Sequence, residues 1–129
     1  MIGSTRQVAV YAYGAPVDMR KGFDGLSALV SQGLGRDPVS GDCDLFANRP
    51  RTRAKVLMWD GTGLCIYAKR LEQGRFAALW RDDHAAKLTL TMSELQLFLE
   101  GSTLVGRLTL SPAPFILRSA QEILASRAH

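Results

Sequence analysis

The pattern of hydrophobic and polar positions predicts a strand followed by a helix near the N-terminus. Residues 7–13, QVAVYAY, are apolar, β-branched and aromatic, as strands usually are. Apolar residues then recur at spacings of three and four from Phe23 to Leu34, which is one stripe of a helix. Asp18 is placed to cap this helix before Met19, and two glycines end it.

The middle of the chain is rich in strand patterns. Residues 43–47 predict a short strand after a loop of turn formers at 35–42. The clearest element is 51–72, where two β-rich runs flank DGTG and predict a β-hairpin. Residues 73–79 follow a glycine turn and predict one further strand.

The C-terminal part predicts a short strand and two helices. Residues 87–90 alternate as a strand does, and Thr91 with Glu94 has the spacing of a capping box before a helix at 92–100. A second helix is expected at 115–127, after a proline-rich turn.

These elements predict a single α+β domain. Consecutive hairpins favour an antiparallel sheet, and we expect two or three helices packed on one face of it. Residues 1–101 are expected to form this domain, and residues 102–129 a turn and terminal helix packed on it.

The length and composition agree with this class. The chain has 129 residues and is 47% apolar, which suits a packed core rather than disorder. No run of about 18 apolar residues occurs, so we expect no membrane partner. The N-terminus lacks the pattern of a secretory signal, so we expect a cytoplasmic protein.

Charge is distributed unevenly along the chain. The net charge is +4, but residues 49–81 hold eight basic and two acidic side chains, which leaves −2 for the remainder. A stretch of one sign favours an anionic partner.

The hairpin offers a surface for such a partner. On its first strand Ala54, Val56 and Met58 share one parity and suit a core. The other parity begins with three cations about 6.6 Å apart, a spacing suited to a phosphate backbone. We therefore predict a nucleic-acid-binding face. The candidate phosphate contacts are Arg49, Arg51, Arg53, Lys55, Lys69, Arg70 and Arg75.

Two alternatives stay open at this stage. The cations could be a solvated face that protects a sheet edge from aggregation. Alternatively Leu57, Trp59 and Tyr67 could dock on a partner protein, so that the chain is an adaptor. Trp59 and Tyr67 border the basic stripe in either hypothesis, although large aromatics such as Trp59 and Trp80 more often belong to a core.

The sequence shows no constellation typical of catalysis. Cys43 and Cys65 match no metal motif and are expected to be reduced thiols buried in strands. In RDDH, residues 81–84, the acids Asp82 and Asp83 are typical of a turn, and a metal-dependent enzyme using them is the remote alternative. We therefore expect no enzyme, no metal and no cofactor.

The stretch VDMRKGFDGL, residues 17–26, places two glycines in the first turns of a predicted helix. Each costs about 1 kcal/mol relative to alanine in a helix interior. One hypothesis is that Gly22 and Gly25 let this face pack closely on the sheet, with Phe23 and Leu26 in the core. The other is that Gly22, Arg20 and Lys21 admit a phosphate near the helix N-terminus.

Four segments together resemble a known family. VDMRKGFDGL, GRDPVSGDCDLF, KVLMWDGTGLCIYAKRLEQGRF and LTMSELQLFLEG occur in this order. They are similar to the small accessory protein, called TnpB or the second open reading frame, of bacterial insertion sequences of the sixty-six family. The resemblance covers roughly residues 8–101.

This resemblance implies a non-enzymatic accessory protein of transposition, encoded beside a larger transposase that carries the acidic catalytic residues. It implies transposon DNA and the transposase of the same element as partners, and self-association is a third expectation. The chain departs from the family after residue 101, where an Ile-Asp-Trp-like continuation is replaced by STLVGRLTL. Residues 102–129 therefore either pack on the domain or mediate self-association.

Overall fold

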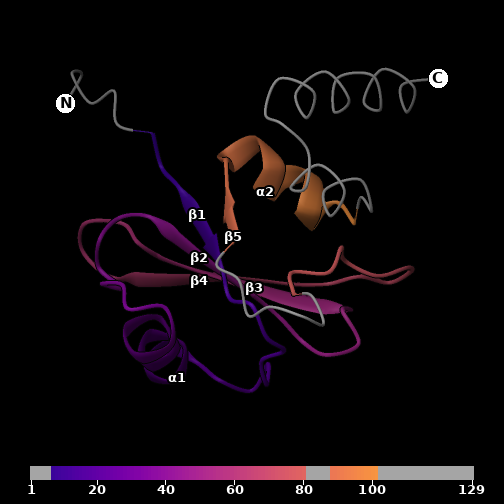
Figure 1. The fold of residues 1–129 in the computed structure, drawn as a ribbon, viewed down its shortest axis with the longest axis horizontal. Helices are drawn as coiled ribbons and strands as arrows, with labels where there is room; N and C mark the ends of the chain where they lie inside the picture. The colour runs from indigo at the N-terminus through magenta and orange to yellow at the C-terminus, as the bar shows by residue number, and fades with distance from the viewer. Residues whose placement is uncertain (1–6, 81–87, 102–129) are drawn as a thin grey trace.

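The computed structural model describes residues 7–80 and 88–101 of the chain. Five strands form one sheet in the order β4-β3-β2-β1-β5 (Figure 1). The elements are β1 (Val10–Ala12), α1 (Phe23–Ala28), the π-helical turn η1 (Leu29–Gly33), β2 (Cys43–Ala47), β3 (Arg53–Trp59), β4 (Leu64–Arg70), β5 (Leu88–Leu90) and α2 (Met92–Leu99).

The fold class is confirmed as α+β, but the sheet is mixed rather than wholly antiparallel. β1 and β2 are parallel neighbours, whereas β2–β3, β3–β4 and β1–β5 are antiparallel. The helical segment α1–η1 lies between β1 and β2 and returns the chain to the end of the sheet where β1 begins. A parallel pair needs such a crossover, which a prediction built on hairpins does not provide.

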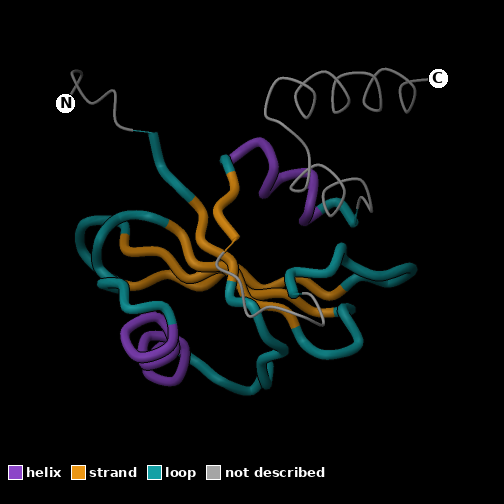
Figure 2. Tube along the Cα trace, in the orientation of Figure 1, coloured by secondary structure: helices purple, strands orange, loops and turns teal. Residues whose placement is uncertain are grey.

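The two helices lie on opposite faces of the sheet, not on one face as predicted (Figure 2). On the α1 side, Leu26 and Val30 pack with Phe46 and Leu57. On the other side, residues of α2 join Val10, Leu45, Val56 and others in a second cluster. All five residues of β2 are buried, because this central strand is covered on both faces.

The helix begins four residues later than predicted. Its N-cap is Gly22 rather than Asp18, and the Leu26 amide donates its hydrogen bond to the Gly22 carbonyl. The preceding residues form a turn in which Asp18 Oδ1 accepts from the Arg20 amide, 2.9 Å away. The Val17 amide donates to the Ala47 carbonyl (2.9 Å), so this turn is tied to the end of β2.

The glycines of this turn and helix do not mediate close packing on the sheet, so that hypothesis is wrong. A Cβ added at Gly22 would meet nothing within 4 Å, and at Gly25 the nearest atoms belong to the Lys21 side chain. Phe23 is 50% exposed, and only Leu26 of the proposed pair lies in the core.

Residues 73–79 do not form the predicted strand. They cross beside the end of the sheet, where the Phe76 amide donates to the Arg51 carbonyl at 2.7 Å. The Phe76 ring stacks on Phe98 of α2, with 4.9 Å between ring centres. The hydrophobic residues of this segment thus pack into the core on the α2 side and do not pair as a strand.

The hairpin, the last strand and α2 agree with prediction. Trp59 pairs with Leu64 across the DGTG turn. At the start of α2, Thr91 Oγ1 accepts from the Glu94 amide (3.1 Å) and Glu94 Oε1 accepts from the Thr91 amide (2.9 Å). The helix expected at 115–127 and the acids of residues 81–84 lie outside the described residues.

A buried ion pair holds the connection between η1 and β2. Asp44 of β2 is 1% exposed, and Arg36 Nη1 donates to its Oδ1. The Arg36 guanidinium also lies 3.7 Å from the centre of the Tyr11 ring and 3.5 Å from Asp42 Oδ2. Burial raises the pKa of Asp44 to about 6 although Arg36 opposes this shift.

This pKa predicts a stability that falls as the pH rises. The pKa of Asp44 in the folded protein lies above its ordinary value of 3.8, so the folded state holds the Asp44 proton more tightly than the unfolded state does. The stability gained from this proton is complete below pH 3.8 and is lost as the pH rises through about 6. The loss amounts to roughly 3 kcal/mol of unfolding free energy at most. Urea unfolding between pH 3.5 and 7 is expected to show this decline in the wild type and a flatter profile in Asp44→Asn.

Two other carboxyls do not obscure the comparison. The pKa values of Asp18 and Asp60 are lowered to about 2, so their stabilising contributions are lost only as the pH falls below 4. Identical slopes for wild type and Asp44→Asn between pH 4 and 6 would contradict the assignment to Asp44.

The capping box makes a second, independent prediction. Thr91→Ala removes the acceptor of the Glu94 amide and should lower the unfolding free energy by about 1 kcal/mol in urea denaturation. Thr91→Ser keeps the hydroxyl oxygen and is the matched control. Equal losses for the two variants would show that the methyl group, not the cap, is what matters.

Candidate nucleic-acid interface

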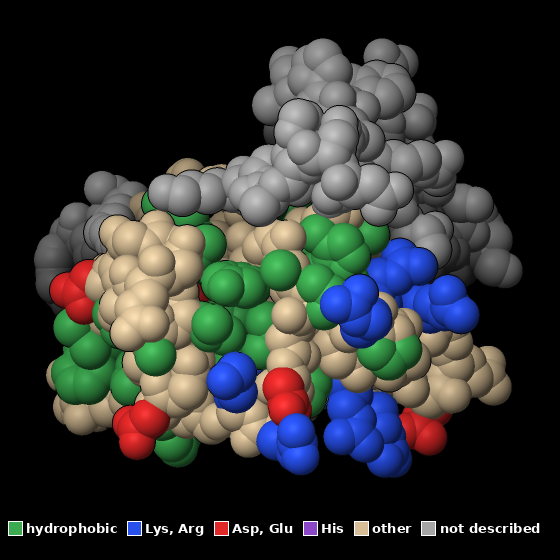
Figure 3. All heavy atoms as spheres, turned by 60° about the horizontal axis from the view of Figure 1, so that its bottom comes forward, with side chains coloured by type: hydrophobic (Ala, Val, Ile, Leu, Met, Phe, Trp, Pro, Cys, Tyr) green, Lys and Arg blue, Asp and Glu red, His purple; other side chains and the backbone are tan. Residues whose placement is uncertain are grey.

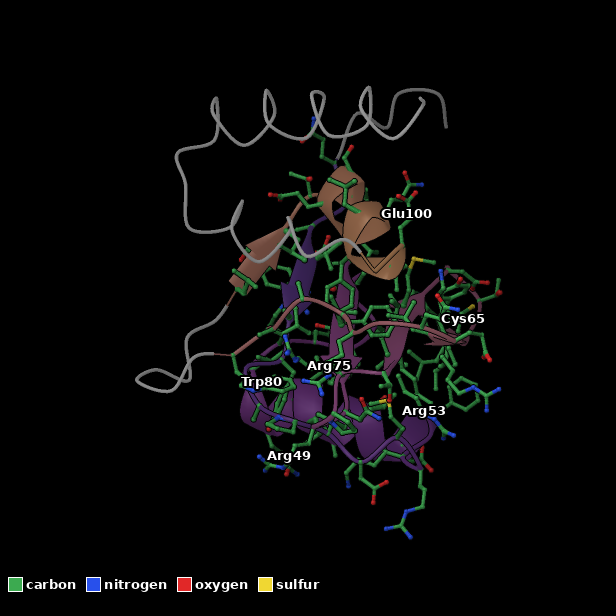
Figure 4. All side chains as sticks on the ribbon, turned by 90° about the vertical axis from the view of Figure 1, so that its right-hand side faces the viewer. Arg49, Arg53, Cys65, Arg75, Trp80 and Glu100 are labelled. Carbon is green, nitrogen blue, oxygen red and sulfur yellow. The ribbon has the colours of Figure 1, made fainter. Side chains whose placement is uncertain are left out.

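Basic side chains gather at one end of the sheet, which we call the basic end. At this end β2 ends, β3 begins and β4 ends, so connections distant in the sequence lie together. Figure 4 faces this end and shows Arg49 from the β2–β3 connection, Arg53 from β3 and Arg75 from the segment after β4. The cations of the basic end include Arg20, Arg49, Arg51, Arg53, Lys55, Lys69, Arg70 and Arg75.

Acidic side chains lie at the opposite end of the same sheet. Asp42 directly precedes β2 and Asp60 directly follows β3, and these strand ends are neighbours because Cys43 pairs with Met58. Asp44 is one residue into β2, and Arg36 pairs with it there. The sheet therefore carries an excess of positive charge at the basic end and of negative charge at the other, which makes the electrostatic potential of the basic end positive.

Two joined grooves open at the basic end. The first, of about 440 Å³, is lined by Met19, Glu72 and the β3–β4 residues from Arg53 to Lys55 and Ala68 to Arg70. The second, of about 500 Å³, runs between residues 16–20 and the β2–β3 connection. Met19 and Arg53 line both grooves. Figure 3 looks toward the α1 face, where Lys and Arg side chains gather on the right beside hydrophobic ones.

The register divides the candidate cations between the two faces of the hairpin. Arg53 lies opposite Arg70, and Lys55 lies opposite Ala68, so these cations share the α1 face. Lys69 lies opposite Ala54 and belongs to the other face. The seven candidates therefore form no single stripe, and they come together through the end of the sheet instead.

Two of the candidates bond to the protein's own backbone. Lys55 Nζ donates to the Lys21 carbonyl at 2.9 Å, which fixes the turn before α1 on the hairpin. Arg51 has a left-handed backbone, with φ of 60°, and its Nη1 donates to the Phe76 carbonyl at 3.3 Å. Both side chains thus hold segments of the fold in place around the grooves.

The remaining cations are available at the surface. Arg20 pairs with Asp18 (2.7 Å), which lowers the pKa of that carboxyl to about 2, and Arg70 pairs with Glu72 (3.3 Å). Both pairs are exposed, and such pairs contribute little and can exchange for a ligand. In the described part of the chain, no acid pairs with Arg49, Arg53, Lys69 or Arg75.

Met19 and Asp18 were not among the binding residues expected from the sequence, and Arg20 entered only through the hypothesis of a phosphate near the helix N-terminus. They reach the grooves because the Val17 amide bonds to the end of β2, a long-range contact with no local pattern. The adjacent basic residues Arg20 and Lys21 were the feature of the sequence that could have indicated this part of the site.

The hydrophobic residues of the adaptor hypothesis do not form one surface. Leu57 is fully buried beneath α1, and Trp59 is half-buried. Tyr67 is 54% exposed but pairs with Val56, which places it on the other face. The prediction that Trp59 and Tyr67 border one basic stripe is therefore wrong. Trp80 packs against the core on the α2 side, as large aromatics usually do.

Both cysteines are free thiols in strands, and Cys43 is buried as predicted. Cys65 is only partly buried, and its thiol lies 3.4 Å from Asp60 Oδ2, which raises the pKa of the thiol. Within residues 7–80 and 88–101, no three His, Cys, Asp or Glu side chains are grouped to hold a metal ion. Asp82 and Asp83 lie outside these ranges. No helix in the same ranges is long and apolar enough to span a membrane.

Comparisons with known proteins support the resemblance seen in the sequence. The family described as "IS66 Orf2 like protein" matches residues 8–107. Uncharacterized protein y4jC of Sinorhizobium fredii is 40% identical over 76 residues, which are 59% of this chain and 65% of that protein. Uncharacterized protein y4hO of the same organism is 32% identical over 101 residues, which are 78% of this chain and 86% of that protein. No solved structure matches the chain.

The structural role of Arg51 can be separated from charge. Arg51→Ala removes the side-chain bond to the Phe76 carbonyl and keeps the unfavourable left-handed backbone, whereas Arg51→Gly removes the same side-chain bond and relieves the backbone. Urea denaturation should find Arg51→Gly more stable than Arg51→Ala by about 1 kcal/mol. The two variants carry equal charge, so equal stabilities would contradict the strained backbone at this position.

Proposed function

The chain belongs to the IS66 Orf2 like family, which serves transposition in an accessory role, and we propose that it does so by holding the phosphate backbone of transposon DNA on its basic end. The family is not a known enzyme family, and we propose no catalytic step. Its partners in this proposal are the DNA of the element and the transposase encoded beside it.

The observation that carries the proposal is the convergence of unpaired cations on two joined grooves. Arg49 and Arg53 line these grooves, and no acid in the described part of the chain neutralises them. A solvated edge that merely prevents aggregation needs charge but no groove. A row of cations along a hollow suits a backbone, whose binding releases condensed counterions.

Such contacts position a protein on nucleic acid without reading its sequence. Choice of the transposon end would then come from the transposase, with this chain adding affinity. The adaptor alternative has less support, because Leu57, Trp59 and Tyr67 do not share an exposed surface.

The proposal is tested by fluorescence anisotropy with a labelled transposon-end duplex and a scrambled duplex across 50–300 mM salt. Wild-type affinity should fall steeply with salt, and Arg49→Ala and Arg53→Ala should each weaken binding and make the salt slope shallower by about one. Gln32→Glu is the matched control. It lowers the net charge by the same amount, but on η1, away from the basic end.

The result that would overturn the proposal is an absence of binding to either duplex at 50 mM salt. The basic end would then be assigned to an acidic surface of the transposase. Equal effects of Gln32→Glu and Arg53→Ala would instead mean that net charge alone drives binding.

A further inference from the structure

Two arginines face each other directly across the β3–β4 ladder. The backbone N–H and C=O of Arg53 both bond to Asn48, so its pairing with Arg70 is of the non-hydrogen-bonded kind. Side chains come closest at such pairs, where the Cα atoms are about 4.5 Å apart. Like charges in this position are destabilising. The free protein thus holds two like charges at directly opposed positions of the ladder.

The groove that both arginines line leaves room for an anion beside them. Ala68 is the neighbour of Arg70 two positions back on the same face, and its small side chain lies opposite Lys55. Met19 also lines the groove, which has a volume of about 440 Å³. Lys55 lines the groove although its Nζ is bonded to the Lys21 carbonyl.

The acid nearby does not neutralise both arginines. Glu72 bonds to Arg70 at 3.3 Å, and both side chains are largely exposed. Arg53 pairs with no acid in the described part of the chain. A tetrahedral phosphate offers oxygens to two guanidinium forks at once, which a carboxylate already held by one arginine does not.

We propose that Arg53 and Arg70 together seat one phosphodiester group of the bound DNA strand. The inference rests on the proposed function, since the phosphodiester comes from the DNA on the basic end. Arg53 lines both grooves, so the strand continues from this seat toward Arg49 in the second groove. Arg70 exchanges its exposed contact with Glu72 for the phosphate when the strand binds.

The first test scans a bound oligonucleotide with single methylphosphonate linkages, which remove the charge of one phosphate at a time. In the wild type, one linkage should cost about tenfold in affinity. The same linkage should become silent in Arg53→Gln and in Arg70→Gln. It should stay costly in Lys69→Gln, the matched control, because Lys69 lies beside Arg70 but on the other face.

Two further variants distinguish an effect on phosphate binding from an effect on the stability of the fold. Ala68→Val narrows the groove without changing the charge, so it should weaken DNA binding. Because valine is favoured in strands, the melting temperature of this variant should equal that of the wild type. Arg53→Gln removes the like-charge pair and should melt no lower than wild type at low salt. A marked loss of stability in Arg53→Gln would overturn the proposal, because Arg53 would then be structural.

A second arm uses inorganic phosphate in thermal melts at constant ionic strength. The wild type and Lys69→Gln should gain melting temperature, and Arg53→Gln and Arg70→Gln should gain less. Equal gains in all four proteins, or DNA binding with no linkage that depends on Arg53, would overturn the seat. Selective stabilisation by phosphate without DNA binding would overturn the DNA origin of the group and the proposed function, and would keep the two-arginine seat.

Discussion

The parallel pairing of β1 with β2 is the constraint on which the rest of this structure depends. It makes β2 the central strand, and the crossover through α1 places a helix on one face of it. The chain then covers the other face with α2 and residues 76–79. A strand covered on both sides is apolar at almost every position, and the one acid of β2, Asp44, is paired with Arg36.

The same topology assembles the basic end. Because β1 and β2 run in parallel, the turn that follows β1 arrives at the end of β2, where the Val17 amide bonds to Ala47. The start of β3 and the end of β4 lie there too. Cations from four separate stretches thus surround two grooves, while Asp42 and Asp60 lie at the far end. The proposed attachment of DNA follows from this separation of charge along the strands.

Sequence reasoning succeeded where one local rule decides the structure. The DGTG turn determines the hairpin, and the Thr91–Glu94 spacing determines where α2 begins. It failed where a local pattern competed with a distant partner. Asp18 has the side chain of an N-cap, yet its segment is bonded to β2 and the helix begins later. The pattern of residues 73–79 predicts a strand, yet the Phe76 ring stacks on Phe98 of α2 and the segment does not pair with the sheet.

The sequence by itself determined the α+β class, the hairpin, the last strand and its helix, the family and the concentration of basic residues. All of these depend on spacing within short windows. Only the tertiary structure decided which cations are available. Arg51 and Lys55 bond to backbone carbonyls, Lys69 lies on the opposite face from Arg53, and Arg53 faces Arg70. The reason is that strand register and partner choice depend on contacts between residues far apart in the chain, which no local spacing records.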